Sequence, residues 1–504
     1  MQPAAPLIVF CQPGDRRSAG IQQARSRLGM PSALLIPYAG LLQGQPLADL
    51  LTLAVQRQIR DGGPGQPLLE QWESLRDYSS GPSERESASG SSSGHPTQES
   101  AGGSFSGHPT QESASGSSSG HLTQESAGGS SSGSSEAEAQ HLLPDSPGSS
   151  SSRHAAPESA ACPPLLRLES PGGSFALERA LIALGAPDAP DADDSLHPFG
   201  QQPDLRPLSF KAASALKDLP GVLHHPSQWF RGYCRLLARL RQEAGQLLPA
   251  SRWTNDPAEI AAMTDKRRTQ QILAESGVSV PRPLRGSGGQ APVDYASLRE
   301  LMLSQRMHRV FIKLASGSAA SGVIAYQLNP ATGAESAVTT IGVESYITRP
   351  PVYYNSGKLQ RYTDSARLAG IINWLYRHGA YAEQWIPKPG KDGHSFDIRQ
   401  LVVAGEACHA VARVSTTPIT NLHLRSRRMT PAEAGLSEAQ QAEVRRTAEA
   451  SLAAFPNCSV AGIDVLAGSS GRMYTADVNP FGDLLYDVEY QGCSTYEWEM
   501  KQLS

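Results

Sequence analysis

The chain opens with short apolar runs that alternate with a helical pattern. Residues 7–11 and 33–36 are apolar runs typical of buried strands, and residues 19–28 between them follow a helical pattern. Because parallel strands need a crossover connection that is usually a helix, this order predicts a small parallel α/β unit. A further helix is predicted over residues 47–60.

The hydrophobic pattern disappears over residues 79–158, which consist mostly of Ser, Gly, Glu, Gln, His and Pro. A short unit repeats there, with His95, His108 and His121 each 13 positions apart. Such a segment cannot bury enough apolar surface to offset its chain entropy, so we predict a disordered insert. A solenoid is not expected, because three short repeats without an apolar face build no core.

Apolar patterning returns with a predicted strand at residues 165–168 and a predicted helix at residues 175–184. Residues 226–244 have the pattern of a long amphipathic helix that faces a core. Its apolar face carries Trp229, Tyr233, Leu236, Leu237 and Leu240. We therefore predict an N-terminal α/β domain, residues 1–78 and 159–250, that the insert interrupts.

Residues 251–504 have the pattern of a strand-rich α+β domain. A helix is predicted to begin at Asp256-Pro257, where an N-cap acid precedes a proline, and a second helix ends before Gly277. Two later helices are predicted over residues 365–377 and 438–453. The predicted strands are residues 310–314, 323–327, 381–385, 398–403 and 410–414.

Composition narrows the class of protein. The net charge of -4 over 504 residues gives no reason to expect a nucleic-acid partner. The six cysteines form no Cys-x-x-Cys pair, which favours a reducing compartment. No apolar run is long enough to span a bilayer, and the first residues lack a signal-peptide pattern. We expect a cytoplasmic protein that binds neither nucleic acid nor membrane.

Two apolar segments near the C-terminus carry acids at their ends. Asp464 lies in the first segment, and Asp477 and Asn479 end the second. Side chains in a strand alternate faces, so Asp477 and Asn479 point the same way, and Asp464 on a neighbouring strand joins them. Two carboxylates and an amide oxygen suit Mg²⁺, with Mn²⁺ as the alternative ion, and such an ion also holds nucleotide phosphates.

Lys313 ends an apolar strand pattern and precedes a loop of small residues, 315–322. The backbone N–H groups of such a loop close over phosphate oxygens, and a lysine at its root adds a positive charge. The loop residues that we expect near a phosphate are Ser316, Gly317, Ser321 and Gly322. An ordinary flexible hairpin is the alternative interpretation.

The segment around Glu383 has the groups that an adenine ring needs. Glu383 offers an acceptor for the adenine amino group, and the backbone of Trp385 or Ile386 offers a donor. A strand with one solvated glutamate is the alternative interpretation.

Three polar residues farther along suit a developing acyl or phosphoryl anion: Arg399, Arg413 and Asn421. The basic run at residues 425–428 is interpreted as a solvated loop or as a contact to an anionic substrate, because the rest of the chain has no basic excess.

In this order the motifs resemble the ATP-grasp superfamily, and within it the RimK-type and glutathione-synthetase-like ligases. The match spans residues 254–483 and begins with Asp265-Lys266-Arg267 on a helix. The resemblance implies a nucleotide held between two β-sheets, after an N-terminal pre-ATP-grasp domain.

The resemblance also implies a role for each motif. Lys266 and Lys313 would hold the ATP phosphates under the 315–322 loop, and Glu383 with Ile386 would read the adenine edge. It further implies that Mg²⁺ binds at Asp464, Asp477 and Asn479, and that Arg413 and Asn421 steady an acyl-phosphate.

Several positions depart from the family pattern. Asp477 stands where the family usually has Glu, Ala319-Ala320 replaces part of a glycine-rich loop, and no glycine pair follows Asn421. The turn after Asn479 also differs from the usual small-residue turn. The last two departures, after Asn421 and after Asn479, bear on the acceptor side more than on the ATP side.

We expect an ATP-dependent ligase that joins a small-molecule or peptide carboxylate to an amine through an acyl-phosphate. A nucleotide-binding partner protein without catalysis and an ATP-grasp phosphotransferase are the alternatives.

Overall fold

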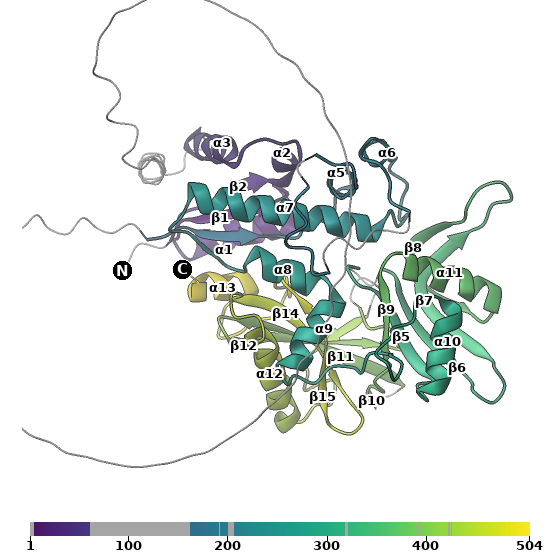
Figure 1. Cartoon of the computed structure of the whole chain (residues 1–504). Coiled ribbons are helices and arrows are strands. Elements are labelled where there is room, and N and C mark those ends of the chain that lie inside the picture. The colour runs from purple at the N-terminus through teal and green to yellow at the C-terminus, as the bar shows by residue number, and fades with distance from the viewer. Residues whose placement is uncertain are drawn as a thin grey trace, which may run out of the picture. The chain divides into compact units, whose positions relative to one another are not determined.

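The described residues form three β-sheets with helices packed against them (Figure 1). The computed structural model describes residues 5–60, 162–190, 192–199, 206–317, 321–391, 393–421, 424 and 426–503. All of them belong to one compact unit, Met1–Gly81 together with Ala161–Ser504. The predicted disordered insert, residues 79–158, lies outside the described residues, and the predicted domain boundary near residue 250 stays a prediction.

The first sheet is the predicted parallel α/β unit, and that prediction is confirmed. Its strands run parallel in the order β2-β1-β3-β4. All residues of β1 are buried, as expected for a parallel strand covered on both faces. The strands are β1 Leu7–Cys11, β2 Leu34–Pro37, β3 Leu165–Leu168 and β4 Arg252–Trp253. The accompanying helices are α1 Arg16–Arg27, α2 Tyr38–Leu42, α3 Leu47–Arg60, α5 Phe175–Leu184, α6 Phe210–Ser214 and α7 Pro226–Leu247.

Helix α7 is the predicted amphipathic helix, extended to Leu247. Tyr233, Leu236 and Leu240 are buried in the core that lies against the first sheet. Helix α7 packs very closely against α5. A Cβ atom placed on Gly232 of α7 would lie only 1.8 Å from the carbonyl oxygen of Leu181 on α5. Glycine at this position therefore sets the spacing of the two helices.

The second sheet is antiparallel, in the order β8-β7-β6-β5-β9. Val310, Ile312 and Leu314 of β5 are buried in a core shared with the helices α10 and α11. Because side chains alternate along a strand, Lys313 lies on the opposite face. The elements are β5 Arg309–Leu314, β6 Val323–Leu328, β7 Glu335–Glu344, β8 Val352–Tyr362, β9 Ala380–Gln384, α10 Tyr295–Ser304 and α11 Ser365–Arg377.

The third sheet has the strand order β13-β12-β11-β14-β15, with β10 paired to β11. Ile398, Ile463 and Val478 belong to a core that includes side chains of α8, α9 and α12, so Asp464 and Asp477 lie on the other face. The elements are α8 Pro257–Thr264, α9 Lys266–Glu275, β10 Gly390–Lys391, β11 His394–Val403, β12 Glu406–Ser415, β13 Arg427–Met429, α12 Glu438–Ala453, β14 Val460–Ala467, β15 Met473–Asn479 and α13 Thr495–Leu503.

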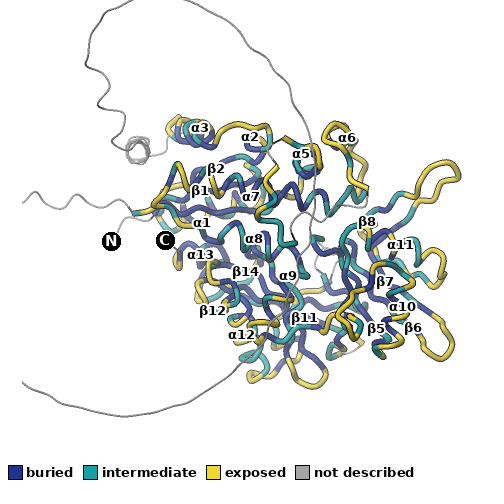
Figure 2. The backbone as a smooth tube through the Cα atoms, viewed as in Figure 1, coloured by how far each residue is buried: buried dark blue, intermediate teal, exposed yellow. Residues whose placement is uncertain are grey.

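Burial follows this arrangement: most central strands are dark blue in Figure 2, whereas the turn between β7 and β8 is exposed. Among the described residues, no helix combines the length and the apolar character needed to cross a membrane.

Candidate active site

The structure places the three predicted metal ligands together on one face of the third sheet. Strands β14 and β15 are antiparallel, with Asp464 opposite Asp477 and Gly462 opposite Asn479. Neighbours in such a pair have Cβ atoms about 5 Å apart, so both carboxylates and the amide share one patch. The side chain of Asn479 donates from Nδ2 to the carbonyl oxygen of Gly462 at 3.0 Å, which leaves Oδ1 as its ligating atom.

Each of the two carboxylates is ion-paired. Asp464 accepts from Arg399 Nε at 2.6 Å and pairs with Arg413 Nη2 at 3.0 Å, and Asp477 pairs with Lys266 Nζ at 2.6 Å. Burial acts to raise the pKa of Asp464, but the two arginines outweigh it and lower that pKa to about 2. Asp464 is therefore an anion throughout the physiological pH range.

Lys313, on the second sheet, contacts this patch of the third sheet. Its Nζ lies 2.6 Å from Glu383 Oε1 and donates to the carbonyl oxygen of Ala476, the residue before Asp477, at 3.4 Å. Burial acts to lower the pKa of Lys313, but Glu383 and Asp477 reverse the effect and the net pKa is raised. Lys313 thus connects the second sheet to the third. We call Lys266, Lys313, Glu383, Asp464 and Asp477 the ionic cluster.

Glu383 is nearly inaccessible, with its side chain only 3% exposed. Its carboxylate is held by Lys313, by a hydrogen bond from Gln270, and by Tyr381 Oη, which donates to Oε2 at 3.0 Å. Position 383 is therefore no solvated strand residue. An adenine amino group there would join a carboxylate that already has three partners.

Of the two backbone donors predicted for the adenine ring, that of Trp385 already has a partner within the fold. The N–H of Trp385 donates to the carbonyl oxygen of Arg309 at 3.2 Å, and its ring contacts Phe311 with centroids 5.3 Å apart. Ile386, which is 4% exposed, is therefore the remaining candidate for the backbone donor.

The root of the small-residue loop contacts the start of α9. The N–H of Lys266 donates to the carbonyl oxygen of Ala315 at 2.9 Å, which ties the loop root to the ionic cluster. Ser316 donates to the carbonyl oxygen of Pro226 at 3.4 Å, and Ser321 accepts from Asn355 at 2.8 Å. Residues 318–320 between them lie outside the described residues.

Both predicted glycines of this loop have tight surroundings. The N–H of Gly317 donates to the carbonyl oxygen of Leu314 at 3.3 Å. Gly322 has a φ of +69°, and a Cβ there would lie 2.4 Å from Leu314 Cδ1. Only glycine fits such a position without strain.

Arg399 and Arg413 flank the ionic cluster on the neighbouring strands. Arg413 Nε donates to Asp397 Oδ1 at 2.7 Å, and Arg399 Nη1 pairs with Asp483 Oδ2 at 3.0 Å. Burial acts to lower the pKa of Arg413, yet Asp397 and Asp464 raise it overall. Each arginine thus bridges two acids.

Asn421 follows Thr420, which shares the partner Asp397 with Arg413. Thr420 hydrogen-bonds to Asp397, which also pairs with Lys388 at 3.4 Å. The Asn421 N–H donates to Ser426 Oγ at 3.0 Å, and its carbonyl oxygen accepts from the N–H of Leu424.

Sequence reasoning did not single out several residues of the site: Gln270, Tyr381, Lys388, Asp397 as an ion-pair partner, and Asp483. Two of them had a usable signal. Gln270 lies four positions after Lys266 on α9 and Tyr381 two before Glu383 on β9, so each shares a face with a predicted residue. The others depend on tertiary contacts between distant segments.

The donor set fits magnesium by its chemistry. Among the described residues, no group of three or more His, Cys, Asp and Glu side chains is placed to hold a metal. Mg²⁺, however, is usually bound by one or two carboxylates together with water and substrate phosphates. Asp464, Asp477 and Asn479 provide two carboxylates and an amide oxygen within one register of paired strands.

Comparison with known proteins gives structural similarity alone. No family model and no curated protein matches the chain. It is similar to the D-Ala:D-Ser ligase VanG of Enterococcus faecalis, with 13% identity and a TM-score of 0.34 over 52% of this chain and 66% of that chain. A biotin carboxylase of Campylobacter jejuni shares 16% identity, with a TM-score of 0.35 over 53% of this chain and 52% of that chain.

The ATP-grasp ligase PsnB shares 14% identity, with a TM-score of 0.31 over 64% of this chain and 72% of that chain. The chain spans 66% and 52% of the lengths of the VanG ligase and the biotin carboxylase. All three solved structures are matched over part of their length and at low TM-scores. At such identities and TM-scores they carry no information on activity, which we infer from the residues of the site.

Proposed function

We propose that the protein is an ATP- and Mg²⁺-dependent ligase that joins a carboxylate to an amine through an acyl-phosphate. One observation carries this proposal. Lys313 of the second sheet contacts the backbone beside Asp477 of the third sheet, and Lys266 pairs with Asp477 itself. Lys266 of α9, Lys313 of the second sheet and Asp477 of the third sheet thus meet at one point, with the charges that a magnesium triphosphate requires.

The ion pairs suggest how the ligand is received. Lys266 and Lys313 now neutralise Asp477 and Glu383, and a triphosphate offers both lysines anionic oxygens instead. Asp464, Asp477 and Asn479 would hold Mg²⁺, which when bound neutralises phosphate charge. Each lysine would exchange a carboxylate for phosphate oxygens, and Asp477 would exchange Lys266 for the metal ion.

The chemistry then rests on placement and charge. The γ-phosphoryl group passes from ATP to the substrate carboxylate, so that ADP leaves and an acyl-phosphate forms. The amine attacks the acyl carbon, loses a proton, and phosphate leaves. Arg399 and Arg413, which pair with Asp464 and their other acids, would stabilise the negative charge that develops on the acyl oxygens.

The test is ADP release from ATP with a panel of carboxylates and amines or peptides. We expect release that needs both partners and that Asp477→Ala and Lys313→Ala abolish. ATP turnover that survives both substitutions would refute the assigned site.

A second candidate, a nucleotide-binding partner protein without turnover, is favoured by one observation. Asp464 is already held by two arginines, so a metal must compete with both for this carboxylate. This alternative predicts ATP binding in calorimetry but no ADP with any acceptor. A phosphotransferase would instead leave a phosphorylated product in place of an amide.

A further inference from the structure

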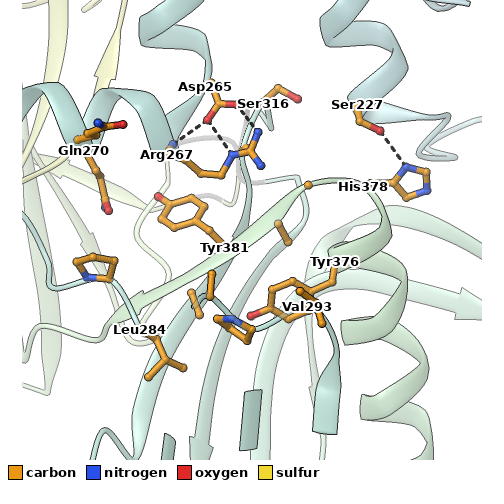
Figure 3. A pocket seen from close by; sticks show the side chains of 18 of the residues that line it. Ser227, Asp265, Arg267, Gln270, Leu284, Val293, Ser316, Tyr376, His378 and Tyr381 are labelled. Atoms are coloured by element: carbon orange, nitrogen blue, oxygen red, sulfur yellow. Dashed lines mark hydrogen bonds and ion pairs between the residues drawn. The ribbon is translucent and has the colours of Figure 1, made fainter. Parts of the chain in front are cut away.

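Figure 3 shows a separate cavity of about 1050 Å³. It lies beside the ionic cluster, because two of its lining residues, Gln270 and Tyr381, hydrogen-bond to Glu383. Its walls come from α7, α9, the end of α11, the start of β9 and the segment around residues 283–293. Of the site residues predicted from the sequence, Ser316 alone lines it. Pockets that bind small organic molecules measure about 300–1,000 Å³, so this one has room for such a ligand. The proposed nucleotide site does not explain it.

Positive charge predominates in the walls. Arg231, Arg267, Arg285 and Arg377 line the cavity, whereas Asp265 is the one carboxylate among its lining residues. Asp265 is committed to Arg267, which it holds at 2.6 and 3.1 Å, as Figure 3 shows. Outside the lining, Asp194 approaches Arg231 at 3.9 Å, and the buried carboxylate of Glu383 accepts hydrogen bonds from the lining residues Gln270 and Tyr381.

The two arginines at the rim have no such compensation. Arg285 and Arg377 are exposed, and within the described part of the chain neither forms an ion pair. Arg285 Nη1 donates only to a carbonyl oxygen, that of Gly289, at 3.1 Å. Cationic groups that line a cavity without an acidic partner attract an anionic ligand, because the low-dielectric walls concentrate their field.

The two histidines in the wall reflect the same surroundings. Burial, with His225 and Arg377 adding to it, lowers the pKa of His378 to about 4. Burial and Arg231 lower the pKa of His197 in the same direction. Both imidazoles are therefore neutral near pH 7 and can donate to an anion without adding charge.

The deeper wall is apolar. Phe230, Val280, Leu284 and Tyr376 line it together with Tyr381, whose ring stands in the middle of the view in Figure 3. Phe230 and Leu284 are buried. A ligand that fills this space therefore needs an apolar body as well as an anionic end.

We propose that this cavity binds an amphipathic organic anion, with its apolar body against Leu284 and Tyr376 and its acidic group at Arg285 and Arg377. The acidic group is a carboxylate, sulfonate or phosphate, each of which arginine binds through paired N–H donors. The site is distinct from the nucleotide site, and its occupation does not depend on the ligase activity.

Two side chains connect the cavity to the ionic cluster. Gln270 and Tyr381 line the cavity, and both donate to the carboxylate of Glu383. A ligand in the cavity therefore touches the groups that fix Glu383, without occupying the place of Lys313. Binding of this ligand and of ATP is expected to be simultaneous rather than competitive.

Titration with anilinonaphthalene sulfonate, a fluorescent molecule with an aromatic body and one sulfonate, tests the proposal on the full chain. We expect saturable binding at one site. The double variant Arg285→Glu/Arg377→Glu is expected to weaken it about tenfold or more, as for the loss of about 1.4 kcal/mol. Ala274→Trp, which fills the cavity without changing charge, is expected to weaken it to a similar degree.

The matched control is Arg445→Glu, an exposed arginine on α12 that does not line the cavity. It should leave the affinity for the probe unchanged. Equal affinity in the wild type, the double variant and Ala274→Trp would overturn the proposal. Stoichiometric displacement of the probe by MgATP would also overturn it, since the probe would then occupy the nucleotide site.

Discussion

The ionic cluster and the cavity beside it share a wall but treat charge in opposite ways. In the cluster every cation meets an acid: Lys266 meets Asp477, Lys313 meets Glu383, and Asp464 has two arginines. At the cavity, Asp265 is paired with Arg267, whereas Arg285 and Arg377 form no ion pair within the described part of the chain. A compensated site must exchange partners to receive a ligand and so favours one that carries both charges, such as a magnesium triphosphate. An uncompensated site suits a simple anion.

Burying the ion pairs of the cluster also costs folding free energy. Lys313 and Glu383 have side chains only 13% and 3% exposed, and removing two charges from water costs several kcal/mol, which their attraction offsets only in good geometry. An apolar pair of similar volume would often be as stable. Retention of the charges at this point therefore favours a function over a purely structural role.

The largest expected effect comes from Asp477→Ala. It removes a proposed metal ligand and leaves Lys266 without its carboxylate. We expect ATP-dependent product formation to fall at least about a thousandfold, of the order found when a main transition-state charge partner is lost. Measurement of ADP and amide product checks this. Glu300→Gln, an exposed acid on α10, is the matched control and should retain full activity.

Lys313→Met separates binding from stability. It leaves Glu383 buried without its cation, so the free energy of unfolding should fall by about 2–4 kcal/mol in urea denaturation. The double variant Lys313→Met/Glu383→Gln should regain most of that stability and still fail to bind ATP. If the double variant binds ATP like the wild type, Lys313 does not contact phosphate.

Arg399→Lys sharpens the comparison on the acceptor side. Arg399 bridges Asp464 and Asp483, and lysine cannot hold both acids in the same fork geometry. We expect kcat to fall roughly 10- to 100-fold, about 2 kcal/mol, while ATP affinity in calorimetry stays near that of the wild type. An equal loss of ATP affinity would indicate that Arg399 acts on the nucleotide rather than on the acceptor.

The smallest effect is the pH dependence set by His378 in the cavity wall. Burial and neighbouring positive charge depress its pKa from 6.5 to about 4. As the pH falls from about 6.5 towards 4, the unfolded chain therefore gains a proton before the folded protein does, and stability is lost. Between pH 7 and pH 5 the wild type should lose roughly 1–2 kcal/mol more than His378→Gln in urea denaturation. Parallel curves for the two proteins would show that His378 does not titrate in this way.

The periodic parts of the fold were predictable. The alternation of side chains along a strand predicted the shared face of Asp464, Asp477 and Asn479. The predicted start of α8 at Asp256-Pro257 is confirmed, and the Asp256 side chain accepts a hydrogen bond from the N–H of Ala258. The strand β8 was missed, because its polar sequence from Val352 to Tyr362 has mostly intermediate burial and no apolar run.

The pairing within the site could not be predicted from the sequence. That Lys313 would take Glu383 depends on β9 lying beside β5 with Lys313 opposite Tyr381, and Lys313 and Glu383 lie in segments far apart in the chain. The cavity depends even more on tertiary structure, since its walls run from His197 to Ala382 and no local pattern marks them. Period and capping are local properties, whereas ion pairs and cavities arise from packing.

Calorimetric titration with ATP, with and without Mg²⁺, tests the central claim most directly. The wild type should bind one ATP, at least about tenfold more tightly with Mg²⁺, and Lys313→Met/Glu383→Gln should lose that binding while remaining folded. Wild-type protein that binds no ATP, or a double variant that binds it with unchanged affinity and magnesium dependence, would contradict the account.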